Sequence, residues 1–202
     1  MIAIIDYGVG NLFSLQCSLN KVGAESVITS DRQTIDNAEK IILPGVGAFG
    51  DAAAKLKLNG LDEVVKRQCA NGKPLLGICV GMQLLLEKSY EYGEHEGLGL
   101  IDGEVVALGD YINGLKIPHI GWNTLSFSGE NPLFSGMKSG EYVYFVHSYF
   151  AKCDKYVSAT TDYGIAVTAA VRKENVFGVQ FHPEKSGNNG LKILKNFARL
   201  KD

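Results

Sequence analysis

The chain has 202 residues, of which 46% are hydrophobic and 21% are charged; this composition fits one ordinary globular domain and excludes an intrinsically disordered chain. Its 20 basic and 22 acidic residues give a net charge of −2, which argues against a nucleic-acid-binding protein with a broad basic face. The N-terminus lacks the pattern of a signal peptide, no apolar run approaches the ~20 residues of a membrane helix, and the four cysteines are widely spaced, so we expect a cytosolic protein without disulfides or a zinc site.

Short apolar segments alternate with helical segments over residues 1–90. This alternation predicts a parallel sheet with helices on both faces. The first predicted helix has Asn11 as its cap and carries Leu12, Leu15 and Leu19 on one face. The remaining elements of this half are predicted strands at 1–6, 26–29, 40–43 and 74–78 and predicted helices at 61–70 and 80–87.

The second half is rich in strands joined by short turns, which favour antiparallel pairing. The predicted strands lie at residues 104–108, 141–147, 155–160, 165–172 and 176–181. A final helix is predicted over residues 191–200. Together the two halves predict one α/β domain over residues 1–202, with a mixed and mainly parallel sheet and an antiparallel extension.

Three loops follow the predicted parallel strands, at residues 6–11, 44–50 and 78–82. Binding sites in such sheets form beyond the carboxyl ends of the strands. All three loops are rich in glycine, and the chain as a whole has 24 glycines, about 12% where ~7% is usual. The excess indicates tight turns and close backbone approaches at this edge of the sheet.

The third loop contains Gly77-Ile78-Cys79-Val80-Gly81, between a predicted strand and a predicted helix. This is the context of a nucleophile elbow with cysteine in place of serine. Side chains at Gly77 or Gly81 would crowd the neighbouring backbone of so sharp a turn. The helix beginning at Val80 favours the reactive thiolate and offers its N–H to an oxyanion. We therefore interpret Cys79 as a candidate nucleophile.

A candidate base lies at the end of the last predicted strand, in His182-Pro183-Glu184. Pro183 restricts His182 to extended conformations, and residues i and i+2 of an extended chain point to the same side. Glu184 can then fix the imidazole tautomer, which gives a nucleophile, a base and an orienting carboxylate. His147 is the alternative base, His119 has a structural or an interface role, and His95 in its charged loop is expected to be solvated.

A second group of donors is predicted in the loop after the third strand, which reads Pro44-Gly45-Val46-Gly47. A turn of this kind can direct backbone N–H groups at an anion. Beside a cysteine elbow, Gly45, Val46 and Gly47 are therefore candidates for the oxyanion hole together with Val80.

The motifs as a set resemble the class I (triad) glutamine amidotransferases, and more closely the glutaminase subunits of imidazole glycerol phosphate synthases. The resemblance rests on residues 6–11, 44–49, 74–83, 118–123, 144–149 and 181–186, which span nearly the whole chain. It implies a three-layer αβα, flavodoxin-like fold without cofactor or metal. It also implies that Cys79, His182 and Glu184 form the triad, and that Gln83, Ser148 and Tyr149 hold glutamine.

Members of that family pass the ammonia they release to a separate (β/α)8-barrel cyclase subunit, in a heterodimer of histidine biosynthesis. The resemblance therefore implies such a partner, and no nucleic acid or membrane. Candidate residues at the interface that ammonia crosses are Asn11, His119, Trp122 and Asn123. Two alternatives stay open: a paralogous glutaminase that serves another synthase, such as a sugar amidotransferase, and a binding module with an inert thiol.

Overall fold

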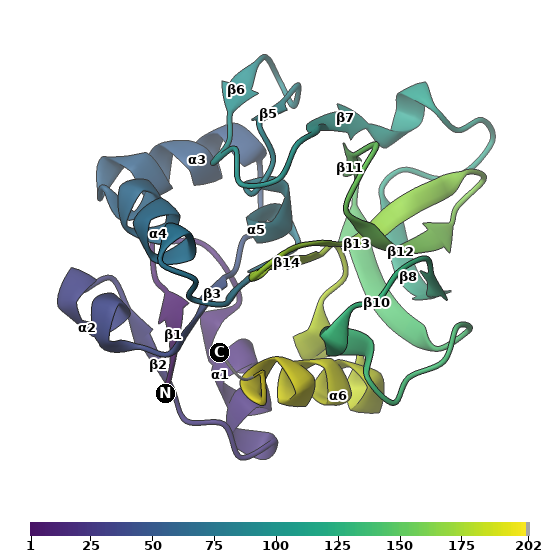
Figure 1. Cartoon of the computed structure of the whole chain (residues 1–202). Helices are drawn as coiled ribbons and strands as arrows, with labels where there is room; N and C mark the ends of the chain where they lie inside the picture. Colours follow the sequence, from purple (N-terminus) through teal and green to yellow (C-terminus); the bar gives the residue numbers. More distant parts are fainter. Residues whose placement is uncertain (201–202) are drawn as a thin grey trace.

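A computed structural model describes residues 1–200 and has an eight-stranded sheet at its centre (Figure 1). The strand order is β2-β1-β3-β4-β14-β13-β12-β9. The parallel strands are β1 (Ile2–Ile5), β2 (Ser26–Thr29), β3 (Lys40–Leu43), β4 (Leu75–Ile78) and β14 (Val176–Val179). The antiparallel extension consists of β13 (Ala166–Lys173), β12 (Val157–Asp162) and β9 (Ser126–Phe127). The order of the first five strands is the flavodoxin-like one, so the predicted fold class is confirmed.

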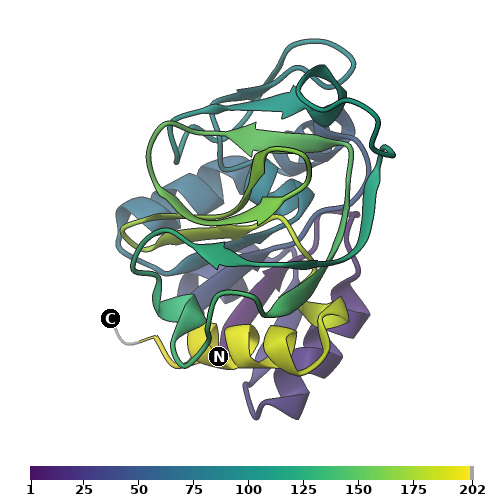
Figure 2. The ribbon, with the colours of Figure 1, turned by 90° about the vertical axis from the view of Figure 1, so that its right-hand side faces the viewer.

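Helices cover both faces of the parallel part. On one face, α1 (Leu12–Lys21) packs against α6 (Gly187–Ala198), which Figure 2 shows in yellow along the lower side of the sheet. On the other face, α3 (Phe49–Leu58) packs against α4 (Leu61–Ala70), and α2 (Arg32–Asn37) lies beside α4 (Figure 1). The short helix α5 (Val80–Gln83) follows β4 and contacts it. Apart from Lys40, the strands between them are apolar because both faces are covered: every residue of β1, β3, β4 and β14 is buried.

Two small sheets complete the molecule. One pairs β8 (His119–Thr124) with β10 (Tyr142–His147), and the other has the order β11-β7-β5-β6. The members of the second sheet are β11 (Tyr149–Lys152), β7 (Glu104–Ala107), β5 (Lys88–Ser89) and β6 (His95–Glu96). The strands β5, β6, β8, β9 and β11 and the helices α2 and α3 were not predicted. Short 3₁₀ turns occur at Leu108–Asp110, Pro132–Phe134 and Pro183–Lys185.

Two helix predictions need correction. The helix predicted over residues 80–87 ends at Gln83, because the carbonyls of Leu84, Leu85 and Leu86 accept hydrogen bonds from residues 98–101. Those bonds replace the i to i+4 pattern that a longer helix would need. Asn11 does occupy the N-cap position of α1, but its side chain makes no capping hydrogen bond.

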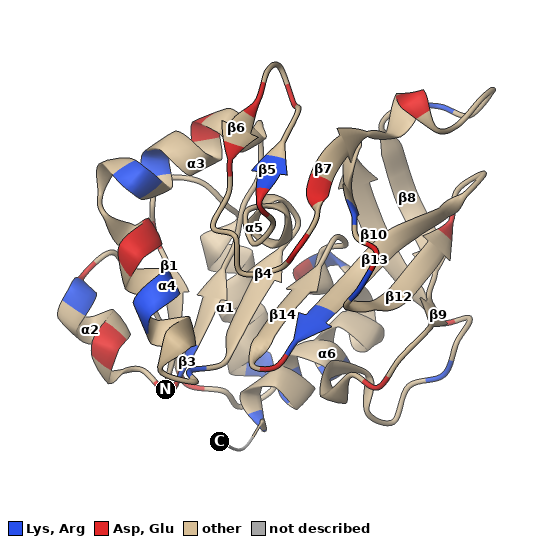
Figure 3. Cartoon of the chain, turned by 45° about the horizontal axis from the view of Figure 1, so that its top comes forward, with Lys and Arg blue, Asp and Glu red and all other residues tan. Residues whose placement is uncertain are grey.

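Charged residues of both signs are interspersed over α2, α3 and α4 in the view of Figure 3. By contrast, β8 and β10 contain no Lys, Arg, Asp or Glu. Within residues 1–200, no helix has both the length and the apolar character required to cross a bilayer.

Candidate active site

Cys79 is the residue at which β4 turns sharply into α5. Its φ of 56° and ψ of −114° are unusual for a residue with a side chain, and strained backbone of this kind concentrates at functional sites. The turn is held by the Cys79 N–H, which donates to the carbonyl of Val179 at 2.8 Å. The predicted need for small neighbours is confirmed: a Cβ at Gly77 would lie 2.6 Å from the Gly81 carbonyl oxygen, and one at Gly81 would overlap the Leu43 carbonyl.

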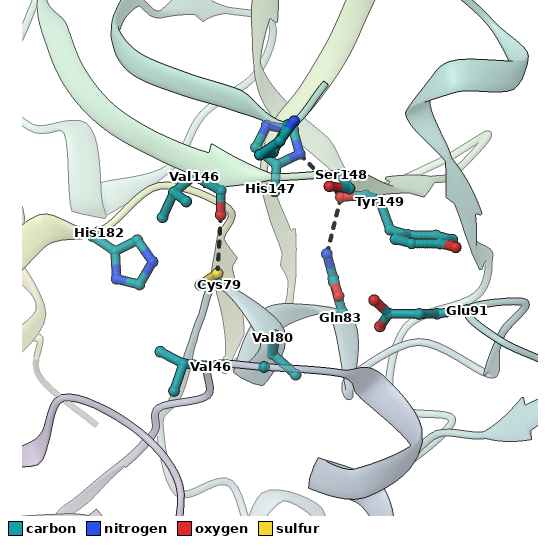
Figure 4. A pocket seen from close by; sticks show the side chains of 12 residues that line it. Val46, Cys79, Val80, Gln83, Glu91, Val146, His147, Ser148, Tyr149 and His182 are labelled. Carbon is teal, nitrogen blue, oxygen red and sulfur yellow. Dashed lines mark hydrogen bonds between the residues drawn. The ribbon is translucent and has the colours of Figure 1, made fainter. Parts of the chain in front are cut away.

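The carboxylate of Glu184 holds the imidazole of His182. His182 Nδ1 and Glu184 Oε1 are 2.8 Å apart, and both side chains are buried, with 3% and 4% of their surfaces exposed. The carboxylate accepts the Nδ1 proton, which fixes the tautomer. Nε2 is then the free ring atom, and it has no hydrogen-bond partner among the described residues. Figure 4 shows this ring beside the sulfur of Cys79.

The charge state of His182 follows from these neighbours. Burial alone lowers the pKa of a histidine, since it penalises the imidazolium form. Here the interactions with Cys79 and Glu184 outweigh burial and raise the pKa of His182 to about 10. The geometry therefore favours an imidazolium next to the sulfur, which is the arrangement that activates a cysteine nucleophile.

A cavity of about 270 Å³ opens over Cys79 and His182. The three residues predicted to hold substrate, Gln83, Ser148 and Tyr149, all line it. Figure 4 shows His182 on one side of Cys79 and Gln83 and Tyr149 on the other. The structure therefore brings the predicted nucleophile, base and binding residues to one pocket, although they come from three separate segments of the chain.

The predicted oxyanion-hole segment lies against the elbow. A Cβ on Gly45 would come within 2.6 Å of the Gly81 nitrogen and 2.9 Å of Val80 Cβ, so only glycine allows this approach. Val46, Gly47 and Val80 line the cavity. The segment is anchored by Tyr7, whose buried hydroxyl donates to the Pro44 carbonyl at 2.6 Å.

The sequence profile of the family "Glutamine amidotransferase class-I" matches residues 3–200. The chain belongs to this family. It is 52% identical to "Imidazole glycerol phosphate synthase subunit HisH" of Sulfurimonas denitrificans, with 100% of this chain and 99% of the relative covered. It is also 52% identical to the protein of that name from Caldanaerobacter subterraneus subsp. tengcongensis, with 99% and 98% covered.

Solved structures show the same fold at low sequence identity. A structure described as "Crystal structure of glutamine amidotransferase" superposes with a TM-score of 0.77 at 18% identity, covering 99% of this chain and 100% of the other. The PurLQS structure from Thermotoga maritima gives a TM-score of 0.74 at 22% identity, with 97% and 96% covered. As a member of this family, the chain is a glutamine amidotransferase.

The pocket of this amidotransferase also contains an acidic residue that no sequence motif identifies. Glu91 is the one acidic side chain among the residues that line the cavity. Its carboxylate accepts the N–H of Phe49 at 2.6 Å, which links the loop before β6 to the first turn of α3. No motif marks residues 90–97, so only the spatial neighbourhood of Glu91 reveals it.

The structure removes His147 as an alternative base for the amidotransferase. His147 Nδ1 donates to the Tyr149 carbonyl at 3.0 Å, so its Nε2 must accept from His119 Nδ1, also at 3.0 Å. His119 Nε2 in turn accepts from Asn123 Nδ2 at 3.3 Å. Burial lowers the pKa of His147 to about 3 and that of His119 to about 4. Both rings are neutral, and both nitrogens of His147 are occupied.

The residues predicted at a partner interface lie in different environments. Trp122 is 55% exposed, whereas His119 is only 3% exposed and stacks on Phe145 and Tyr163. The expectation for His119 is therefore corrected: its ring lies beneath the surface. Asn123 is partly buried and donates to the Asp162 carbonyl. Asn11 is partly buried at the start of α1.

Two further observations concern the remaining titratable groups. His95 does not project freely from its loop: its ring packs against Gly50 of α3, where a Cβ would lie 2.7 Å from His95 Cε1. No group of three or more His, Cys, Asp or Glu side chains suited to a metal ion occurs within residues 1–200.

Proposed function

We propose that this amidotransferase is the glutaminase subunit of an imidazole glycerol phosphate synthase, built on residues 1–202 as one domain and acting in the cytoplasm. The observation that carries the proposal is the meeting of the Cys79 elbow with the buried His182–Glu184 pair in one pocket. The names of relatives 52% identical over nearly the full chain support the pathway assignment.

The first half-reaction uses the thiolate and the imidazolium. The Cys79 sulfur attacks the carboxamide carbon of glutamine, and the C–N bond breaks as His182 Nε2 gives its proton to the leaving nitrogen. Ammonia and a γ-glutamyl thioester result. The negative charge on the carbonyl oxygen of the tetrahedral intermediate is stabilised by the Val80 N–H and by donors of the Gly45–Gly47 segment.

The second half-reaction reverses these roles. The neutral His182 takes a proton from water, the water oxygen attacks the thioester carbon, and the carbon–sulfur bond breaks to release glutamate. The Cys79 thiolate and the His182 imidazolium are restored. Glu184 keeps Nδ1 protonated throughout, so that Nε2 is always the atom that exchanges protons.

The same pocket supplies groups for the α-amino and α-carboxylate ends of glutamine. Glu91 is placed to pair with the substrate ammonium, since it brings negative charge to the end of the pocket away from His182 (Figure 4). Gln83, Ser148 and Tyr149 offer amide, hydroxyl and backbone groups along the wall.

We propose further that a (β/α)8-barrel cyclase, as the partner in a heterodimer, covers the uncharged face of β8. Ile120 and Trp122 are 58% and 55% exposed on this strand, although large apolar side chains are ordinarily buried. Ile120 pairs across the ladder with Val146, which lines the pocket. Ammonia released at Cys79 would therefore emerge next to the covered face.

Co-purification with the histidine-pathway cyclase, followed by glutamine turnover with and without its nucleotide ligand, tests the assignment. We expect strong stimulation by the loaded cyclase and no turnover for Cys79→Ala. Rescue of a histidine auxotroph separates this function from that of a paralogue serving a sugar amidotransferase or another synthase. Absence of both stimulation and rescue would refute the pathway assignment, and thiol-independent turnover would refute the mechanism.

A further inference from the structure

Gln180 is a fully buried polar residue that the mechanism above does not use. It follows β14 directly and lies two residues before His182, and 0% of its surface is exposed. Its Nε2 atom lies 3.7 Å from Cys79 Sγ, in the geometry of a hydrogen bond to sulfur. A buried carboxamide is costly unless its groups are paired, so the partner of each atom defines how the side chain is held.

The orientation of the Gln180 amide is determined by its neighbours. Its Oε1 atom accepts from Gln83 Nε2 at 3.0 Å, and the same Gln83 nitrogen donates to the Tyr149 carbonyl at 3.0 Å. Because Gln83 faces two acceptors, it must present its NH₂ group to both. The oxygen of Gln180 therefore points at Gln83, and only its NH₂ group is left to face the sulfur.

Further hydrogen bonds hold the Tyr149 carbonyl, the acceptor of Gln83, in place. The Tyr149 carbonyl also accepts from His147 Nδ1, whose other nitrogen is occupied by His119. A continuous set of hydrogen bonds thus runs from β8 through His147, Tyr149 and Gln83 to Gln180. A donor held in this way needs no rearrangement when charge appears on the sulfur, which is the condition for effective electrostatic stabilisation.

Two neighbouring groups have opposite effects on the protonation state of Cys79. The Val146 carbonyl lies 4.0 Å from Sγ and accepts from the protonated thiol. The Gln180 NH₂ group can donate to either form, and its hydrogen bond is stronger when the sulfur is charged. Removal of the Gln180 donor therefore shifts the balance toward the unreactive thiol.

We propose that Gln180 stabilises the thiolate of Cys79 by donating a hydrogen bond from its carboxamide, and so sets the reactivity of the nucleophile. This inference rests on the proposed role of Cys79 as the nucleophile. It assigns to Gln180 a direct contact with a reacting atom, and to Gln83 the additional task of orienting that donor.

The test is the pH dependence of Cys79 alkylation by iodoacetamide, followed on the Cys79 peptide by mass spectrometry. Gln180→Met keeps the length of the side chain and removes the donor. Gln180→Glu keeps an acceptor for Gln83 and places a carboxylate beside the sulfur. The midpoint is the pH at which the alkylation rate of Cys79 reaches half of its plateau. We expect this midpoint to rise by about one pH unit in Gln180→Met, which corresponds to tenfold slower alkylation at a fixed acidic pH. In Gln180→Glu it should rise further.

The matched control is Gln68→Met on α4. It removes another buried glutamine amide, whose Nε2 donates to Asp36. It should leave the Cys79 midpoint unchanged. Alkylation of the buried Cys69 reports unfolding in every variant. If Gln180→Met is unfolded, the midpoint of Gln180→Glu is compared with that of the wild type instead. Midpoints of the folded Gln180 variants equal to that of the wild type would overturn the proposal.

Alkylation requires neither glutamine nor the cyclase, so the two proposals fail separately. A shifted midpoint with neither cyclase-stimulated turnover nor rescue of the auxotroph would refute the pathway assignment and leave the role of Gln180 standing. An unchanged midpoint with normal stimulation by the cyclase would refute the role of Gln180 and leave the pathway assignment standing.

Discussion

The neutral pair of His119 and His147 makes the stability of this protein sensitive to mild acid. Burial lowers the pKa of His147 to about 3 and that of His119 to about 4, from an ordinary value of 6.5. The folded state keeps both rings neutral at pH 5, whereas the unfolded state protonates both below pH 6.5. The unfolded chain binds more protons, so stability is full above pH 6.5 and is lost as the pH falls toward 4 and then 3.

The size of the effect follows from the pKa difference. Moving from pH 7 to pH 5 costs about 2 kcal/mol for each histidine that stays neutral in the fold, because one pKa unit corresponds to 1.36 kcal/mol. The pair therefore removes about 4 kcal/mol, a large part of the 5–15 kcal/mol typical of a domain. His182 does not add to this loss: its raised pKa gives a contribution that is full below pH 6.5 and disappears as the pH rises through about 10.

The variant that tests this pH dependence is His119→Asn. The asparagine amide can take the place of the Nδ1–H that His119 offers to His147, and it does not titrate. We expect the free energy of unfolding, measured by urea titration with circular dichroism, to fall between pH 7 and pH 5 by about 2 kcal/mol less in the variant than in the wild type.

The control is His95→Asn, on β6 and outside the hydrogen-bonded pair; it should retain the full loss of the wild type. Carboxylates titrate alike in all three proteins and cancel in the comparison. An equal loss of unfolding free energy between pH 7 and pH 5 in His119→Asn and in the wild type would show that the His119 ring is not held neutral in the folded state.

Three further substitutions probe other parts of the site. Gly81→Ala drives a methyl group into the Leu43 carbonyl and should lower the urea-derived free energy of unfolding by about 3 kcal/mol; a near-normal value would contradict the packing of the elbow. Glu91→Gln keeps an acceptor for its neighbouring N–H but loses its charge, so KM for glutamine should rise about tenfold with a smaller change in kcat; an unchanged KM would exclude its pairing with the substrate ammonium. Tyr7→Phe removes the donor to Pro44 and should destabilise the fold by about 1–2 kcal/mol in thermal unfolding, and no loss would show that water replaces the hydroxyl.

Much of the parallel half of the fold could be predicted from the sequence, because its strands are buried on both faces. Runs such as residues 40–43 and 75–78 are apolar at every position or nearly so, and the structure places strands at these positions. The helix α4 was predicted with its observed bounds for a related reason: its amphipathic spacing is regular and it ends at Asn71-Gly72. By comparison, β8 carries His119, Gly121 and Asn123, which do not form a strand pattern in isolation.

The local chemistry of this protein follows from short stretches of its amino-acid sequence. The small residues around Cys79 and the spacing of His182 and Glu184 are properties of short segments, and steric limits on the backbone act over the same range. The remaining features of the site arise from the folding of distant segments against one another. Folding places Glu91 in the pocket, occupies both nitrogens of His147, buries His119, and directs the amide of Gln180 at the sulfur. These outcomes depend on contacts between residues tens of positions apart, and the pattern of a local segment does not encode such contacts.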